Sequence, residues 1–252
     1  MTLHRFFVSE HSAGGFGPIR LSDADAHHVL DVLRLGAGDS IVCVDPAGVA
    51  LEVRITRVDG GALEGEAVGN VEAAPVPRVW LVQGLAKGEK MDAVVRQATE
   101  LGVERIVPLS SSRSVVKLDG PKAEAKRERW QRVAREAAKQ SQRASVPDVA
   151  PVASIAALGA ELGGAALVLV AWEDASNAPS IRQAIRDADL ATEDVVAVVV
   201  GPEGGFSAEE VAELVATGAR TVWLGPTILR TETAGVVASA LALSARGGLG
   251  GE

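Results

Sequence analysis

The sequence predicts an α/β protein with a mostly parallel sheet in its C-terminal part and a small β-rich domain before it. Beyond residue 78, apolar runs typical of strands alternate with helical patterns, which is the order of a parallel α/β sheet. Residues 195–200 read Val-Val-Ala-Val-Val-Val, as expected for a strand buried on both faces. The chain has no Tyr and only 4 Phe, so its core must be built from Ala, Val and Leu, which suits such a sheet.

A proline-containing linker separates the two predicted domains. Pro75 and Pro77 resist both helix and central strand and stiffen the chain, so we expect one domain at residues 1–72 and a second at 73–252. In the first domain we expect a helix at 23–35, capped by Ser22 or Asp23 and ended by Gly36. The strands expected there lie at residues 4–8, 40–45, 50–59 and 62–69.

The second domain is expected to alternate strand and helix along its length. Ser207 and Glu210 have the spacing of a capping box, which predicts that a helix begins after Ser207. The expected strands are 78–85, 105–109, 166–172, 195–200 and 221–224, and the expected helices are 89–101, 121–142, 179–188, 208–216 and 232–245.

Two glycine-bearing motifs follow predicted strands near the C-terminus. The first motif, residues 201–207, reads Gly-Pro-Glu-Gly-Gly-Phe-Ser, and the second motif, residues 224–234, reads Leu-Gly-Pro-Thr-Ile-Leu-Arg-Thr-Glu-Thr-Ala. Ligands bind at the C-terminal edge of an open parallel sheet, where backbone amides and helix N-termini converge. Alone, the first motif is equally compatible with a simple strand-to-helix turn. Its pairing with the second motif at this spacing favours a ligand site.

Both motifs resemble those of the SPOUT methyltransferases, whose C-terminal chain passes through a loop to make a trefoil knot that holds S-adenosylmethionine. Within that superfamily they are similar to the signatures of bacterial 16S ribosomal RNA uridine N3-methyltransferases. The likeness covers nearly the whole chain, because residues 5–8, 28–34, 97–103, 113–116 and 136–143 share it. Gln142 departs from the pattern, since it stands where that family favours a small residue, often glycine.

The resemblance implies a PUA-like RNA-binding β-barrel for the first domain and a SPOUT trefoil-knot domain for the second. It also implies S-adenosylmethionine as cofactor, 16S ribosomal RNA of the small subunit as substrate, and a homodimer. Glycines in the first motif let the backbone approach a ligand, and the leucines and isoleucine of the second would wall an adenine pocket. The residues expected to bind the donor are Gly201, Pro202, Glu203, Gly204, Gly205, Leu224, Gly225, Ile228, Leu229, Arg230 and Thr231.

Methylation at uracil N3 requires loss of the N3 proton, because the nitrogen is a good nucleophile only as that proton leaves. Arg230 is the first candidate for catalysis, since a fixed guanidinium beside the donor could stabilise the uracil anion. Glu232 is either a base, a partner of an arginine, or a helix N-terminal residue that interacts favourably with the helix dipole.

Basic residues gather between positions 113 and 143 although the chain as a whole has a net charge of −8. The segment holds ten basic and four acidic residues, a local footprint suited to RNA phosphates. The alternative is a solvated helix stabilised by pairs such as Glu128–Arg132. The residues expected to contact RNA, by charge and by resemblance, are Arg5, Arg34, Arg113, Lys139 and Arg143.

Other motifs expected of nucleotide and metal sites are missing from the sequence. It contains neither the Gly-x-Gly-x-x-Gly fingerprint nor a P-loop, and its four His and one Cys suggest no metal site. The lone Cys43 cannot form an intrachain disulfide, and no apolar run reaches membrane-spanning length, so we expect a cytoplasmic protein. Two rival functions stay open: a SPOUT enzyme that acts on transfer RNA or on a ribose oxygen, and a non-catalytic RNA-binding module.

Overall fold

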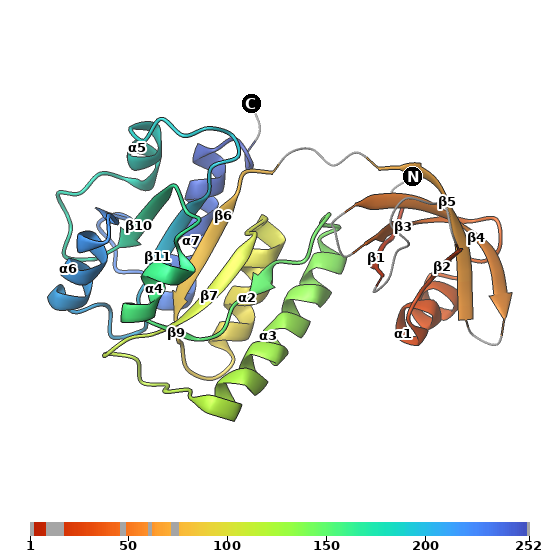
Figure 1. Ribbon diagram of the computed structural model, residues 1–252, viewed down its shortest axis with the longest axis horizontal. Coiled ribbons are helices and arrows are strands. Elements are labelled where there is room, and N and C mark those ends of the chain that lie inside the picture. Colours follow the sequence, from red (N-terminus) through yellow and green to blue (C-terminus); the bar gives the residue numbers. More distant parts are fainter. Residues whose placement is uncertain (1–2, 9–17, 46–48, 60–61, 72–75, 251–252) are drawn as a thin grey trace. The chain divides into compact units, whose positions relative to one another are not determined.

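The computed structural model describes residues 3–8, 18–45, 49–59, 62–71 and 76–250 (Figure 1). The chain forms two compact units, of which the first comprises Met1–Pro75 and Ala138–Ser145, and the second Val76–Ala137 and Val146–Glu252. The proposed domain boundary after residue 72 lies outside the described residues. The assignment of Ala138–Ser145 to the first unit has no counterpart in the sequence-based division.

The first unit is built on a five-stranded sheet in the order β1-β3-β4-β5-β2. Strand β1 pairs in parallel with β3, and the remaining pairs are antiparallel. This sheet confirms the predicted small β-rich domain. Strand β2 was not predicted, because three residues are too short to show a period. The strands are β1 (Arg5–Phe7), β2 (Pro18–Arg20), β3 (Ser40–Val44), β4 (Ala50–Asp59) and β5 (Ala62–Asn70).

One helical segment contributes to the core of this sheet, and it ends earlier than predicted. Helix α1 (Asp23–His27) is capped by Ser22, as expected, and continues as a π-helix, η1 (His28–Val32). The prediction that Gly36 ends the helix was wrong. The amide of Leu33 closes a wide turn onto the carbonyl of His28 at 3.0 Å, and Arg34 then takes the left-handed conformation with φ 57°.

The second unit contains a seven-stranded sheet in which every described pairing is parallel. Its main order is β12-β10-β11-β6-β7-β8, and β9 also pairs with β7. The sequence missed β8 and β9, which have two residues each. The strands are β6 (Val79–Gly84), β7 (Arg105–Ser110), β8 (Asp148–Val149), β9 (Ala153–Ser154), β10 (Leu167–Ala171), β11 (Val196–Val200) and β12 (Arg220–Val222).

Helices cover both faces of this sheet. Helices α2, α3, α5 and α7 pack into a core on one face, and α4 and α6 into a core on the other. Strand β11 contributes Val196, Val198 and Val200 to the first core and Ala197 and Val199 to the second, which explains its continuous apolar run. The helices are α2 (Lys90–Leu101), α3 (Gly120–Gln140), α4 (Ile155–Glu161), α5 (Ile181–Arg186), α6 (Ala208–Ala216) and α7 (Thr231–Ala245).

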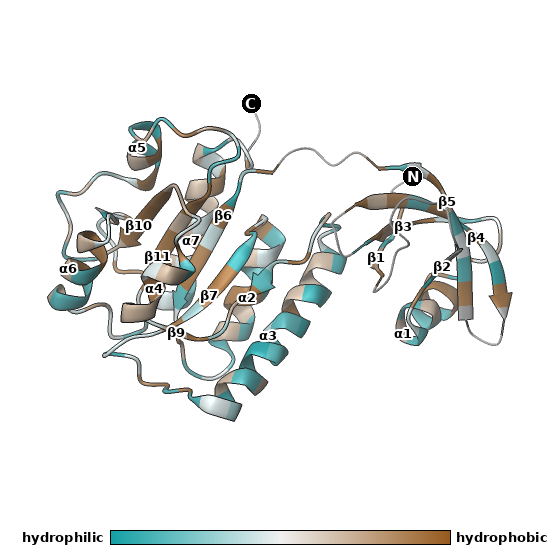
Figure 2. Ribbon diagram, viewed as in Figure 1, coloured by the Kyte–Doolittle hydropathy of each residue, from teal (hydrophilic) through white to brown (hydrophobic). Residues whose placement is uncertain are grey.

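Hydropathy follows these layers, since apolar colour fills β10 and β11 while α3 shows mainly polar residues outward (Figure 2). The predicted capping box is confirmed: Ser207 Oγ accepts from the Glu210 amide at 3.2 Å, and Glu210 Oε2 accepts from the Ser207 amide at 3.0 Å. Helix α4 was not predicted. Among the described residues, no helix is both long and apolar enough to cross a membrane.

Candidate functional site

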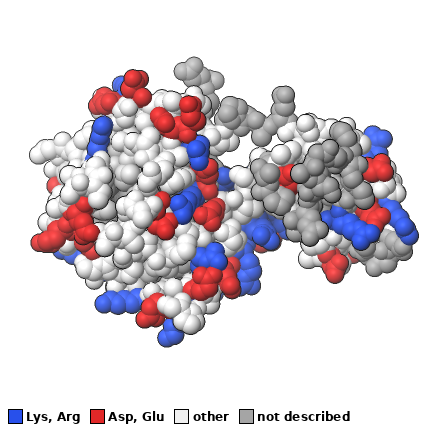
Figure 3. Space-filling view, in the orientation of Figure 1, with Lys and Arg blue, Asp and Glu red and all other residues white. Residues whose placement is uncertain are grey.

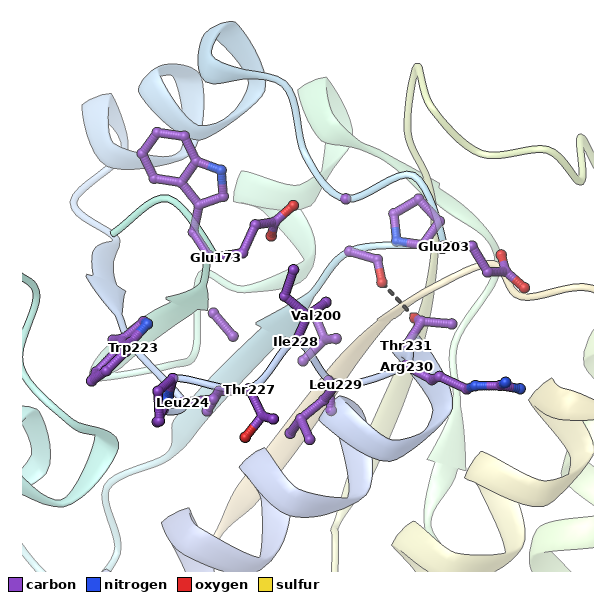
Figure 4. Close-up of a pocket in the computed structure, with 18 of the residues that line it drawn as sticks. Glu173, Val200, Glu203, Trp223, Leu224, Thr227, Ile228, Leu229, Arg230 and Thr231 are labelled. Carbon is purple, nitrogen blue, oxygen red and sulfur yellow. Dashed lines mark hydrogen bonds between the residues drawn. The ribbon is translucent and has the colours of Figure 1, made fainter. Parts of the chain in front are cut away.

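A cavity of about 460 Å³ lies at the C-terminal edge of the parallel sheet (Figure 4). Its walls come from the loops that follow β10, β11 and β12, together with the starts of α2 and α7. This is the edge at which an open parallel sheet binds ligands. The expected donor-binding residues that line it are Gly201, Pro202, Glu203, Gly205, Leu224, Gly225, Ile228, Leu229, Arg230 and Thr231.

Gly204 is the one expected donor-binding residue that does not line the cavity. A glycine is needed there for another reason, which is the close approach of Arg113. A Cβ added to Gly204 would lie 3.0 Å from both the Cβ and the carbonyl oxygen of Arg113. The Arg113 guanidinium in turn donates to the carbonyls of Gly204 at 3.3 Å and Phe206 at 3.2 Å. Gly204 therefore lets the first motif pack against Arg113.

Gly205 faces the cavity and is constrained on two counts. Its φ of 67° lies in the left-handed region, and a Cβ there would come within 2.3 Å of Glu173 Oε1. The amide of Gly205 closes a tight turn onto the carbonyl of Pro202 at 2.9 Å. The first motif thus keeps its shape through a backbone conformation that other residues rarely adopt.

The two motifs are joined by a buried hydrogen bond. Thr231 Oγ1, at the start of α7, donates to the carbonyl of Gly201 at 2.5 Å, the bond drawn as a dashed line at Thr231 in Figure 4. Gln83 Nε2, at the end of β6, donates to the same hydroxyl at 2.8 Å. The segment after β12 therefore lies directly beside the loop after β11, an arrangement that the expected knot requires.

Lys90 brings two carboxylates together at the cavity. Its Nζ lies 3.3 Å from Glu203 Oε1 and 3.2 Å from Glu232 Oε2. Hydrogen bonds to Glu232 and Glu203 raise the pKa of Lys90. Partial burial works against ionisation of Glu203, but hydrogen bonds from the Lys87 amide and Lys90 prevail and hold the pKa of Glu203 below its ordinary value. The described ion pair of Glu232 is therefore with Lys90 and not with Arg230.

Arg230 and Ile228 are among the exposed members of the second motif. The Arg230 guanidinium has no hydrogen bond or ion pair with any described residue, and its side chain extends away from the apolar wall formed by Leu224 and Leu229 (Figure 4). Ile228 is 89% exposed. Both side chains are therefore available to a molecule that enters the cavity from solvent.

Four of the five residues expected to contact RNA belong to the first compact unit. Arg5 Nη1 donates to the carbonyl of Gln142 at 2.5 Å, and burial lowers the pKa of Arg5. Lys139 Nζ lies 2.5 Å from Asp25 Oδ1. Arg34 is exposed and Arg143 is half-buried. Arg113 lies in the second unit, beside the first motif.

Gln142 has a φ of 55°, in the left-handed region where glycine is favoured. This backbone conformation accounts for the family's preference for glycine at a position where this chain has Gln.

On α3 the described ion pairs differ from the one expected. Arg127 pairs with Glu124 at 2.5 Å and Arg129 pairs with Asp92, whereas the Glu128–Arg132 pair is not among them. Figure 3 shows Lys and Arg atoms interspersed with Asp and Glu atoms over the described surface.

Comparison with known proteins decides the family. The chain matches the RNA methyltransferase domain family over residues 72–243 and the RNA methyltransferase PUA domain family over residues 21–68. It is 35% identical over 218 residues to ribosomal RNA small subunit methyltransferase E of Bacillus subtilis (strain 168), covering 85% of each chain. The chain belongs to the small subunit methyltransferase E family. Its C-terminal α/β domain is therefore a SPOUT methyltransferase domain.

Further members show the same relation. The counterpart in Mycobacterium bovis (strain ATCC BAA-935 / AF2122/97) is 34% identical over 228 residues, which cover 88% of this chain and 85% of the other. A crystal structure of the Neisseria gonorrhoeae protein, bound to S-adenosyl methionine, superposes with a TM-score of 0.79. It is 28% identical and covers 95% of this chain and 96% of that one.

In this methyltransferase, sequence reasoning missed several residues that line or support the cavity. They share one signal, because each follows the C-terminal end of a parallel strand within a few residues or lies at that end. Trp172 is notable because its buried indole Nε1 has no hydrogen-bond partner among the described residues. No group of three or more metal-ligating side chains occurs in the described ranges. Outside the two motifs the residues missed were Gln83, Lys90, Ala171, Trp172, Glu173, Val200 and Trp223; within the second motif they were Pro226, Thr227 and Ala234.

Proposed function

We propose that this protein transfers the methyl group of S-adenosylmethionine to N3 of a uridine in ribosomal RNA of the small subunit. The observation that carries the proposal is the cavity of about 460 Å³ at the meeting point of the two motifs. Its volume is within the range of small-molecule sites. A relative of the same fold is bound to S-adenosyl methionine, and named relatives act on small subunit ribosomal RNA.

The proposed reaction breaks the bond between the sulfonium sulfur and its methyl group and forms a bond between that methyl and uracil N3. The N3 proton leaves, and S-adenosylhomocysteine is released. We assign to Arg230 the stabilisation of the uracil anion, because its guanidinium is exposed beside the cavity and has no partner among the described residues. Glu232 is engaged by Lys90, which favours a positioning role for it over that of a free base.

RNA binding is proposed to involve Arg5, Arg34, Lys139 and Arg143 of the first unit, with Arg113 at the first motif. The exposed cations of α3 are further candidates for contacts with RNA phosphates. Phosphate contacts explain how a chain with a net charge of −8 could bind RNA, because the basic residues are concentrated while the acidic ones are dispersed.

A homodimer is also proposed, formed through α7. This helix supplies one face to the core, yet Val236, Val237 and Ala240 are only partly buried and Leu241 is 37% exposed. A single chain therefore leaves apolar surface on a helix that adjoins the donor cavity.

Two measurements test the proposed function. Calorimetry with S-adenosylmethionine separates an enzyme from a non-catalytic RNA-binding module, which would bind no donor. Mass mapping of methylated nucleosides in ribosomal RNA from a deletion strain should show loss of one N3-methyluridine. Loss of a ribose-methylated nucleoside, or of a transfer RNA modification instead, would support the rival SPOUT activities.

A further inference from the structure

We infer that Gln83 is a positioning residue that orients the Thr231 hydroxyl and so locks the two motifs around the donor cavity. The inference rests on the proposed function, because it treats the cavity as the donor site. Gln83 is the penultimate residue of β6, is 0% exposed and lies outside both motifs. It does not line the cavity itself. Its hydrogen bond to Thr231, which does line the cavity, connects it to the site.

The hydrogen bonds fix the direction of this relay. A threonine hydroxyl carries a single proton, and that of Thr231 is donated to the carbonyl of Gly201 at 2.5 Å. The hydroxyl oxygen can then only accept from Gln83, so the amide nitrogen must face Thr231, at 2.8 Å. The same nitrogen donates to the carbonyl of Gly84 at 3.2 Å, which fixes the amide plane.

The other end of the Gln83 amide requires a gap in α7. Gln83 Oε1 is buried and has no hydrogen-bond partner among the described residues. A Cβ added to Gly235 would lie 2.0 Å from this oxygen. Gly235, one turn along α7 from Thr231, therefore leaves the space in which the side chain of Gln83 is seated. An alanine at this position would push the amide away from Thr231.

This arrangement explains why a polar side chain is buried in an otherwise apolar core. Leaving Gln83 Oε1 unsatisfied costs free energy, which a purely structural leucine would avoid. In compensation, the hydrogen bond from Gln83 fixes the orientation of the Thr231 hydroxyl, which then donates to the carbonyl of Gly201. Since Gly201 opens the loop that lines the cavity, its orientation sets the position of the donor-binding backbone.

The test measures S-adenosylmethionine affinity by calorimetry for Gln83→Leu, Gln83→Glu, Thr231→Val and Thr231→Ser, with the unfolding midpoint of each recorded separately. Gln83→Leu and Thr231→Val should each weaken binding roughly tenfold, as expected for one buried hydrogen bond. The double variant should be no weaker than the worse single one, because both act through one relay. Thr231→Ser, which keeps the hydroxyl, should restore affinity.

Gln83→Glu gives a readout that a structural role does not predict. A carboxylate at this position accepts from Thr231 and diverts its proton from Gly201, whereas the protonated acid can donate as the amide does. Burial raises the pKa of such a carboxyl group. The donor affinity of this variant should therefore recover as the pH is lowered, while that of the wild type should not.

Matched controls separate the relay from general damage to α7. Gly235→Ala should weaken donor binding as Gln83→Leu does, whereas Gly159→Ala places the same methyl group on α4 where nothing lies within 4 Å. Ser239→Ala removes a buried α7 hydroxyl that donates to the carbonyl of Gly235 at 2.8 Å. Both controls should retain wild-type affinity.

The outcomes distinguish this inference from the proposed function. If the wild type binds the donor and the Gln83 and Thr231 variants bind it equally well, the inference is overturned while the donor site stands. Additive losses in the double variant would likewise overturn it. A wild type that binds no S-adenosylmethionine would overturn the proposed function and the inference with it.

Discussion

At the scale of single residues, the cavity contains two kinds of charged group. Lys90 forms ion pairs with both Glu203 and Glu232, at 3.3 and 3.2 Å. Arg230 has no described partner and is exposed. The ion pairs of Lys90 are suited to holding the loops in place. The Arg230 guanidinium, which has no described partner, is suited to stabilising negative charge that develops on a substrate.

Replacement of Arg230 by alanine should reduce turnover by about a hundredfold or more, because one preorganised donor is lost. Lysine should rescue little, since a point charge does not reproduce the planar fork. A higher pH should partly restore the rate by favouring the deprotonated base. The measurement is single-turnover methylation of small-subunit particles at saturating donor over a pH series.

The control for Arg230 is Arg220→Ala, which removes an exposed arginine from β12. That variant should keep wild-type turnover. Wild-type turnover in Arg230→Ala itself, with only weaker RNA binding, would remove Arg230 from the catalytic step.

Replacement of Lys90 by methionine should lower the free energy of unfolding in a pH-dependent way. The pKa of Glu203 is depressed in the folded state, so its contribution is present above the ordinary carboxyl pKa and is lost as the pH falls through the lowered value. The pKa of Lys90 is raised, so its contribution persists until the pH exceeds that raised value. The difference from wild type should be greater at pH 7 than at an acidic pH below the lowered pKa of Glu203.

Urea denaturation at both pH values measures this difference, and Lys87→Met is the control, because Lys87 meets Glu203 through its backbone amide alone among the described contacts. An equal loss at both pH values for Lys90→Met would contradict the ion-pair explanation.

At the scale of elements, the first motif is a strand-to-helix connection whose conformation is set from three sides. Arg113 holds the carbonyls of Gly204 and Phe206, the capping box begins α6 at Ser207, and Glu210 Oε1 accepts from the amide of Ser112 at 2.7 Å. These contacts hold the loop in one shape before any ligand arrives. Preorganisation of this kind reduces the entropy that binding must remove.

Gly205→Ala should destabilise the fold by about 1 to 2 kcal/mol, because residue 205 has a left-handed backbone conformation. It should also weaken donor binding strongly, because the added Cβ would collide with Glu173 Oε1. Gly218→Ala is the matched control, because Gly218 has φ 100° and nothing within 4 Å of an added Cβ. It should lose similar stability but bind the donor as the wild type does. Calorimetry and thermal unfolding of the two variants make the comparison, and equal donor affinity in both would remove Gly205 from the site.

At the scale of the whole molecule, RNA affinity and assembly are properties of surfaces that no single motif describes. Arg34 can be replaced by glycine to test its contact with RNA, because its φ of 57° is a conformation that glycine adopts without strain. Arg34→Gly should keep the free energy of unfolding within about 1 kcal/mol of wild type while it removes a cation. RNA binding should weaken, and the slope of log affinity against log salt should fall by about 1.

Gln142→Gly provides the control, since Gln142 has φ 55° in the same compact unit and carries no charge. Filter binding across a salt series measures both variants. An unchanged salt slope in Arg34→Gly would show that Arg34 contacts no phosphate.

The proposed dimer predicts that Leu241→Glu yields a monomer, because a charge on the apolar face of α7 resists burial. Sedimentation equilibrium of the wild type and the variant tests this. Val215→Glu on α6 is the control, since Val215 is also exposed, at 45%, and lies outside α7. A wild type that sediments as a stable monomer and still binds donor would refute the dimer.

The sequence by itself determined those structural features that depend on residues close together in the chain. The apolar run of β11 and the capping box at Ser207 follow from local patterns, and the structure confirms them. It also contains every strand and helix expected in the second domain, together with β8, β9 and α4, which were not predicted. The two motifs likewise indicated where the cavity lies, because the rule that ligands bind at the C-terminal edge of a parallel sheet needs no detailed geometry.

Only the tertiary structure decided how that cavity is held together. Gln83 and Thr231 are 148 positions apart in sequence, and Arg113 and Gly204 are 91 apart, so no periodic pattern relates them. Short strands such as β2, β8 and β9, and the π-helical turn that replaced the predicted end at Gly36, likewise depend on the surroundings of each segment. The physical reason is that such contacts arise from the order of strands in the sheet, which brings side chains together across it without leaving a local signal in the chain.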